Sequence, residues 1–290
     1  MITKYAQHAK KLPGFTYKLL AQSWIDKEWP RHIFIETTAN CNLTCSYCPR
    51  EDISKEMDFD IFKQIVDEAS HYGARSFSLH LFGEPLLYSH WQEAINYIKL
   101  QNSNHTVLLT TNGTLLNKQV DAVIMSRVDK VIWSWRPEAK FTQETKEKLR
   151  KWGRFQVRIL KQVTPKRAWE EWKDWRPIEV KNLHNYGGNI ELGKFGVLSA
   201  DNGQRYPCYH LWYAPAVAWN GDILICCNDP HHREVIGHFP EMSIAQAWKS
   251  PRLEELRNAH LSGKYPSICQ GCDVWKTYPD LWFNHQKKSL

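Results

Sequence analysis

The chain has 290 residues, of which 42% are hydrophobic and 24% charged, and its formal net charge is +7. This length suits one large domain, or a large domain and a small one, and the composition is that of a soluble globular protein. No apolar run approaches the roughly 20 residues of a membrane span, and the first residues lack the apolar core of a secretion signal. We therefore expect a cytoplasmic protein without a membrane partner. Its basic residues are scattered rather than clustered, which does not favour a nucleic-acid partner.

Strand patterns alternate with helical patterns after a short basic extension over residues 1–30, and this alternation predicts parallel strands joined by crossover helices. Six strand–helix units within residues 31–190 indicate an α/β fold, a partial (β/α)6 TIM-like barrel with its active residues at the carboxyl ends of the strands. The strands are predicted at 31–38, 75–82, 105–111, 130–135, 154–163 and 177–183, and the helices at 57–73, 89–100, about 118–127, 142–152 and 167–175.

The pattern changes after about residue 185. Asn220 and Gly221 lie between two apolar runs, which is a strong β-hairpin signal. Two short helical segments follow and meet at Pro251, and the last segment carries cysteines in a loop-like context. We therefore divide the chain into an extension at 1–30, a barrel at 31–190, and a small C-terminal iron–sulfur domain of a β-hairpin and short helices at 191–290.

Eight cysteines in a reducing compartment indicate metal ligands rather than disulfides. Three of them, Cys41, Cys45 and Cys48, directly follow the first predicted strand with the spacing C-x3-C-x2-C. Three thiolates can hold three irons of a four-iron cluster and leave the fourth iron open, as a reactive site requires.

The run CNLTCSYC resembles the cysteine signature of the radical S-adenosylmethionine (SAM) superfamily. The resemblance implies that SAM binds the open iron of a 4Fe-4S cluster and is cleaved by electron transfer to a 5′-deoxyadenosyl radical, which abstracts a hydrogen atom from the substrate. It implies a one-electron donor such as flavodoxin or ferredoxin. It also places Tyr47 near the adenine of SAM.

Further motifs at strand ends carry the same resemblance. The run FGEP is similar to the family's GGEP segment, with Phe82 in place of the first glycine, and it implies that Gly83, Glu84 and Pro85 position SAM. Asn112 lies in the run TTNG, which matches a recurrent family turn. Ser134 stands where a family serine binds the SAM ribose, although the usual SID-like run is SWR here. Arg158 either meets the SAM carboxylate or faces outward.

The remaining cysteines form a second set. Their spacing resembles the C-terminal SPASM extension of radical SAM enzymes in its shortened form, the twitch domain, and is similar to that of an aminocyclitol dehydrogenase of the superfamily. The resemblance implies an auxiliary 4Fe-4S cluster on Cys208, Cys226, Cys269 and Cys272; a structural zinc site on the same residues is the alternative. Cys227 is left over, either as a small buried residue or as a hydrogen-atom donor in catalysis.

An auxiliary cluster can accept an electron from a substrate radical, so we expect oxidation of a small hydroxylated or carbohydrate-like substrate. Three alternatives stay open at this point. They are epimerisation with Cys227 as hydrogen donor, peptide modification as by many SPASM proteins, and a zinc-stabilised nucleic-acid-binding protein without catalytic activity.

Overall fold

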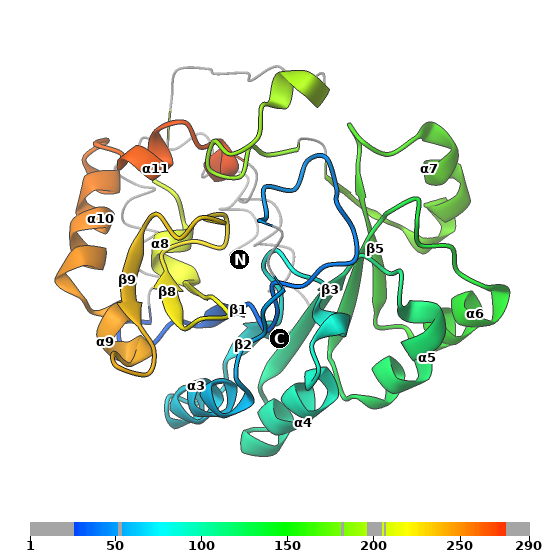
Figure 1. Cartoon of the computed structure of the whole chain (residues 1–290), viewed down its shortest axis with the longest axis horizontal. Coiled ribbons are helices and arrows are strands. Elements are labelled where there is room, and N and C mark those ends of the chain that lie inside the picture. The colour runs from blue at the N-terminus through cyan, green and yellow to red at the C-terminus, as the bar shows by residue number, and fades with distance from the viewer. Residues whose placement is uncertain (1–25, 52–53, 181–182, 196–204, 206, 277–290) are drawn as a thin grey trace, which may run out of the picture.

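The computed structural model describes residues 26–51, 54–180, 183–195, 205 and 207–276. Its strands form one nine-stranded sheet in the order β6-β5-β4-β3-β2-β1-β7-β8-β9, so β6 and β9 are its edges within the described residues. The sheet follows an open arc, with helices along its outer side (Figure 1).

The predicted partial barrel is confirmed, because all neighbours among β1 to β6 pair in parallel. Its strands are β1 (His32–Ile35), β2 (Ser76–Ser78), β3 (Thr106–Thr111), β4 (Lys130–Ser134), β5 (Phe155–Leu160) and β6 (Ile178–Val180). Its helices are α3 (Phe59–His71), α4 (Trp91–Gln101), α5 (Leu116–Met125), α6 (Gln143–Trp152) and α7 (Lys166–Trp172), with short 3-10 turns η1 (Pro85–Leu87) and η2 (Lys173–Trp175).

The C-terminal part adds the predicted hairpin to the same sheet. Strands β7 (Ala216–Val217) and β8 (Asp222–Leu224) pair antiparallel around Asn220-Gly221, and β7 pairs in parallel with β1. The other elements are η3 (Leu192–Phe195), α8 (His210–Tyr213), β9 (Val235–His238), α9 (Ile244–Trp248), α10 (Pro251–Leu261), α11 (Ser267–Gln270) and η4 (Val274–Lys276). The domain boundaries near residues 30 and 190 stay predictions, and residues 1–25 of the expected extension lie outside the described residues.

The second strand is shorter than its sequence pattern predicts. It ends at Ser78 instead of continuing to Phe82. The N–H of Leu79 still donates to the carbonyl of Leu108 on β3 at 3.1 Å, but further along the chain the N–H of Glu84 donates to the carbonyl of Asn40 at 2.7 Å. The loop after β2 therefore lies against the cysteine loop rather than extending the sheet.

Strand β1 shows which side of the sheet faces the helices. Its side chains alternate across the two faces, as in any strand. Ile33 and Ile35 are fully buried in the main core with the helices, whereas Phe34 packs with Leu81 and Cys227 on the other face. The side chains of this second face, on the concave side of the arc, are those available for chemistry.

Helix α3 (Phe59–His71) lies within the range 57–73 that its sequence predicts. The carboxylate of Asp58 accepts hydrogen bonds from the N–H groups of Asp60 at 2.8 Å and Ile61 at 3.1 Å, which caps the first turn. Gly73 follows the helix with a φ of +87°, a conformation that favours glycine. Among the described residues, no helix combines the length and the apolar character that a membrane span needs.

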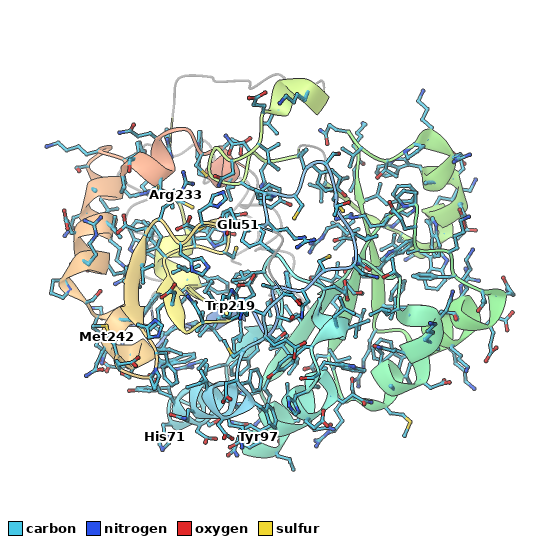
Figure 2. All side chains as sticks on the ribbon, in the orientation of Figure 1. Glu51, His71, Tyr97, Trp219, Arg233 and Met242 are labelled. Carbon is cyan, nitrogen blue, oxygen red and sulfur yellow. The ribbon has the colours of Figure 1, made fainter. Side chains whose placement is uncertain are left out.

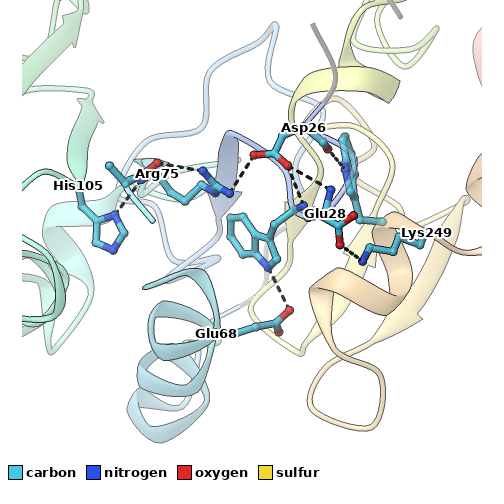
Figure 3. Close-up of polar contacts among 9 residues, drawn as sticks. Asp26, Glu28, Glu68, Arg75, His105 and Lys249 are labelled. Carbon is cyan, nitrogen blue, oxygen red and sulfur yellow. Dashed lines mark hydrogen bonds and ion pairs between the residues drawn. The ribbon is translucent and has the colours of Figure 1, made fainter. Parts of the chain in front are cut away.

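Glu68 on α3 joins the barrel to the C-terminal part. Figure 3 shows Glu68 near the contacts of Asp26, Glu28 and Lys249. The Glu68 carboxylate accepts hydrogen bonds from the indole N–H of Trp29 at 3.0 Å and from the backbone N–H groups of Ile244 at 3.0 Å and Ala245 at 2.7 Å. Ile244 and Ala245 form the first turn of α9, where backbone N–H groups have no acceptor within the helix. The same region is tied again by Trp248, whose indole N–H donates to the carbonyl of Asp26 at 2.8 Å.

We expect Glu68→Ala to lower the free energy of unfolding by about 2–4 kcal/mol, because three donors lose a charged acceptor at once. Urea denaturation of the purified protein measures this change. The matched control is Glu93→Ala on the exposed side of α4, which should stay within about 0.5 kcal/mol of the parent. Equal stability of the two variants would show that this contact does not hold the two parts together.

Candidate active site

The loop after β1 brings three thiols together. Cys41, Cys45 and Cys48 are all free and half-buried, and the N–H of Cys48 donates to the carbonyl of Cys45 at 3.0 Å. Burial, reinforced by the neighbouring thiols of Cys45 and Cys41, raises the pKa of Cys48. Grouped buried thiols ionise when a bound metal supplies the positive charge, so this loop fits a cluster of irons.

The backbone of the loop after β2 lies directly on the cysteine loop. A Cβ atom added at Gly83 would be 2.0 Å from the carbonyl oxygen of Thr38 and 2.9 Å from that of Asn40. Only glycine fits such an approach, because a real Cβ does not come within 3.0 Å of backbone. Pro85 begins η1 immediately afterwards, which fixes where the loop ends.

Glu84 connects the two loops to the turn after β3. Its buried carboxylate accepts from the hydroxyl of Thr111 at 2.7 Å and from the backbone N–H groups of Asn112 at 2.7 Å and Leu86 at 3.2 Å. Burial raises the pKa of Glu84 to about 7 despite these hydrogen bonds. The Glu84 carboxylate thus links the loop after β2 to the turn after β3 through hydrogen bonds within the chain.

Asn112 reaches from that turn to the cysteine loop. Its side-chain N–H group donates to the side-chain oxygen of Asn42 at 2.9 Å and lies 3.8 Å from the sulfur of Cys41. The backbone carbonyl of Asn112 accepts a hydrogen bond from the indole N–H of Trp133 at 3.0 Å. The predicted residues of FGEP and TTNG thus meet the cysteine loop in one place, as the sequence motifs predict.

Ser134 and Arg158 are directly opposite each other at the carboxyl ends of β4 and β5. The neighbouring residues Val157 and Ile159 are fully buried in the core, so Arg158 points to the opposite face of β5. Its charge also helps to lower the pKa values of His80 and His184. The SAM contacts predicted for Ser134 and Arg158 stay predictions.

The second set of cysteines converges in the C-terminal part. Burial raises the pKa of Cys269 to about 12 and that of Cys272 to about 11, and the thiol of Cys226 adds to both shifts and to that of Cys208. Cys208 and Cys226 lie well before the C-x2-C pair of Cys269 and Cys272 in the sequence, and the fold brings these thiols near enough for their charges to interact. Four neighbouring, partly buried thiols fit a closed metal site with no position left open.

Cys226 and Cys227 face different surroundings. Cys226 packs against the main core together with Cys269, whereas Cys227 packs with Phe34 and Leu81 on the concave side. The side chain of Asn228 lies between them, with its N–H group 3.5 Å from each sulfur. The two sulfurs nevertheless lie within 4.8 Å of each other and of a ring nitrogen of His210, so the choice of Cys226 over Cys227 as the cluster ligand stays a prediction.

Neutral hydrogen-bonding groups line the concave side near Arg158. Burial lowers the pKa of His80 to about 3 and that of His184 to about 4, so both imidazoles are neutral at pH 7. Tyr186 packs on His184, with 4.0 Å between ring centroids, and burial raises its pKa to about 12. Such a wall offers donors and acceptors without net acidic charge.

The segments around this site also contact one another across the two parts of the chain. His231 lies 2.9 Å from a carboxylate oxygen of Glu51, which follows the cysteine loop. Arg233 donates to the carbonyl of Gly187 at 3.2 Å. Figure 2 labels Glu51, Arg233 and Trp219 around this region. The loop after Cys227 therefore holds both the cysteine loop and the segment that carries Tyr186.

Sequence reasoning missed two residues of this region. Tyr186 lies in a run of turn-forming residues that indicates only a loop. Arg136 lies in the run SWR, two residues after Ser134, and its guanidinium is 5.0 Å above the ring of Tyr47. The available signal for Arg136 was its charge, which is opposite to that of the acidic residue in the SID-like run.

Two protein-family profiles match the chain. The radical SAM superfamily matches residues 35–132, and the iron–sulfur cluster-binding SPASM domain matches residues 203–273. These ranges contain all the cysteines that we group into the two sets.

Similar proteins include radical SAM enzymes of several activities. A GTP 3′,8-cyclase of Chlorobaculum tepidum is 32% identical over 34% of this chain, which spans about a third of that relative (31%). The tungsten-containing aldehyde ferredoxin oxidoreductase cofactor-modifying protein of Pyrococcus furiosus is 28% identical, covering 88% of this chain and 92% of its own. The SAM-dependent 2-deoxy-scyllo-inosamine dehydrogenase of Niallia circulans is 23% identical, covering 83% and 92%.

Solved structures show the same fold. BtrN in complex with AdoMet and 2-DOIA superimposes with a TM-score of 0.62 at 21% identity, covering 84% of this chain and 92% of BtrN. SuiB of Streptococcus suis bound to its precursor peptide gives the same TM-score at 15% identity, covering 88% and 73%.

The two family matches imply the cofactors. The first domain implies SAM and a 4Fe-4S cluster, and the second implies auxiliary iron–sulfur binding. The grouped thiols, and the glycine that alone fits beside the cysteine loop, agree with this. The chain is a member of the radical SAM superfamily that carries a SPASM-type iron–sulfur domain at its C-terminal end.

Proposed function

We propose that this protein is an oxidoreductase that dehydrogenates a small hydroxylated or carbohydrate-like substrate. The observation that carries the proposal is the grouping of Cys208, Cys226, Cys269 and Cys272, which lie near enough to one another for their charges to interact. When bound, SAM and its cluster supply the radical that removes a substrate hydrogen atom, and an auxiliary cluster supplies an acceptor for one electron.

The chain's own residues position these groups. Cys41, Cys45 and Cys48 hold the first cluster, while Gly83, Glu84, Pro85 and Asn112 shape the SAM site beside it. Tyr47, Ser134 and Arg158 complete this site in the proposal. His80 and His184 offer neutral donors and acceptors on the same side, which suits a hydroxylated molecule.

The proposed oxidation balances in atoms and electrons. The substrate CH–OH group loses a hydrogen atom from carbon to the SAM-derived radical, then a proton from oxygen and one electron, and becomes a carbonyl. An external one-electron donor of the flavodoxin or ferredoxin type reduces the first cluster. The similarity to the inosamine dehydrogenase of Niallia circulans supports this chemistry.

The test is a substrate screen with anaerobically purified protein, reductant and SAM in deuterated water. Aminocyclitols and free sugars are the first panel, and mass spectrometry follows product and 5′-deoxyadenosine. Dehydrogenation yields a product two mass units lighter than its substrate, with one product per SAM cleaved. A product of unchanged oxidation state that carries one carbon-bound deuterium would instead show epimerisation.

Epimerisation is the second candidate because the thiol of Cys227 lies on the concave side with Phe34 and Leu81. A thiol there could give its hydrogen atom to a substrate radical. Peptide modification has weaker support, since the likeness to SuiB at 15% identity concerns the fold alone. The zinc-protein alternative is not supported, because both matched families bind iron–sulfur clusters.

We expect Cys227→Ala to retain both clusters, with about eight irons per chain. If dehydrogenation is the reaction, the variant turns over normally, because the thiol takes no part in it. If epimerisation is the reaction, 5′-deoxyadenosine still forms but the epimer falls by at least about a hundredfold. Iron analysis and product quantification measure both, with Cys227→Ser as a size-matched control that removes only the sulfur.

A further inference from the structure

A half-buried arginine lies beside the cysteine loop. Arg136 follows β4, and its Nη1 donates to the carbonyl of Trp135 at 2.7 Å and to that of Ser134 at 3.4 Å. Its guanidinium lies 5.0 Å from the ring centroid of Tyr47, and Tyr47 packs with Cys45. The side chain is thus anchored at its own strand end and extends to the segment that carries the cluster ligands.

The positive charge of Arg136 has little compensation within the chain. Among the described residues, no carboxylate lies within ion-pair distance of it, although Glu84 is close enough to feel its charge. Its Nε is shielded from solvent and has no hydrogen-bond partner in the described part of the chain. A half-buried cation with a shielded, unused donor is stabilised when an anion lies beside it.

An iron–sulfur cluster on the cysteine loop would supply the negative charge that Arg136 lacks. Thiolates that hold iron, with the sulfides of the cluster, make an electron-rich group at Cys41, Cys45 and Cys48. Cys45 is the member of this set that interacts with the guanidinium. The run SWR also reverses the charge of the SID-like run that it resembles, so this cation distinguishes the chain at that position.

We propose that Arg136 is a positioning residue that raises the reduction potential of the SAM-binding cluster through its positive charge beside Tyr47 and Cys45. Reduction adds one negative charge to the cluster. A nearby cation stabilises the reduced form more than the oxidised form, so the electron is accepted more readily. The inference rests on the cluster at Cys41, Cys45 and Cys48, and is independent of the substrate.

The experiment is a potentiometric titration of the anaerobic holoenzyme followed by electron paramagnetic resonance. It uses a Cys269→Ala background, which removes the signal of the auxiliary cluster. At a fixed solution potential, we expect Arg136→Gln to lower the reduced-to-oxidised ratio of the cluster about tenfold, which equals about 59 mV for a one-electron couple. Arg136→Lys keeps the charge and should change the ratio less than about threefold.

The matched control is Arg150→Gln. In the parent protein the guanidinium of Arg150 lies 4.9 Å from the ring centroid of Trp175, on the outer side of the barrel. The Arg150→Gln variant should leave the ratio unchanged. An unchanged ratio in Arg136→Gln with full iron content overturns the proposal, even if SAM binding weakens, because Arg136 would then act on SAM alone. If Arg136→Gln does not load the cluster, the Lys variant decides, and a tenfold change in it overturns the charge argument.

No substrate enters this titration. Failure of the proposed dehydrogenation would therefore leave its outcome unaffected, and failure of the titration would leave the dehydrogenation assay interpretable.

Discussion

Gly83→Ala is expected to lower SAM cleavage by at least about a hundredfold, because displacement of a positioning group by about 1 Å has an effect of this size. The added methyl group would lie 2.0 Å from the carbonyl oxygen of Thr38. Both contacting segments are backbone, so neither side can move away as a flexible side chain would. The loop must separate from the cysteine loop, and the SAM position changes with it.

The measurement is 5′-deoxyadenosine formation under reducing conditions, together with SAM binding and iron content. Gly193→Ala is the matched control, since a Cβ there meets nothing within 4 Å, and it should behave like the parent. Overpacking should also destabilise the Gly83→Ala protein by about 1–3 kcal/mol. Normal cleavage by this variant would show that the close approach of the two loops is not needed for catalysis.

Cys269→Ala should separate SAM cleavage from substrate oxidation. The variant loses one of the four ligands of the auxiliary site, so iron falls from about eight to about four per chain. The first cluster is held by a different loop, and 5′-deoxyadenosine should still form. Product formed per SAM cleaved is expected to fall by at least about tenfold, because the electron from the substrate has no acceptor.

Metal analysis and product-to-deoxyadenosine ratios test this expectation. Ser267→Ala in the same short helix is the control, and it should keep both clusters and the ratio. About four irons and one zinc in the parent would instead identify the second site as zinc and remove the proposed electron acceptor. An unchanged ratio in Cys269→Ala would mean that oxidation does not need this site.

The fold was predictable because its signals are local and repeated. Six alternating patterns gave the parallel strands, and Asn220-Gly221 gave the hairpin that the structure contains. The length of β2 was not predictable, because the chain after Leu79 leaves the sheet and Glu84 bonds to Asn40, a contact between segments far apart in the sequence.

The residues of the candidate site were likewise predictable only in part. The motif residues Gly83, Glu84 and Asn112 meet the cysteine loop as expected, since carboxyl ends of neighbouring parallel strands lie together. Spacing favoured Cys226 over Cys227 as a ligand, and the two side chains do have different surroundings. Arg136 and Tyr186 gave no periodic or motif signal, because their importance comes only from what the folded chain places beside them.

The parallel pairing of β7 with β1 has a consequence for how the chain can be divided. The N–H of Glu36 donates to the carbonyl of Val217 at 2.8 Å, and that of Phe34 to the carbonyl of Pro215 at 3.1 Å. A chain truncated near residue 190 would leave this side of β1 as an open edge with unpaired backbone groups, which is a template for aggregation. The predicted domain boundary near residue 190 is therefore not a position at which the chain can be cut into two units that fold independently.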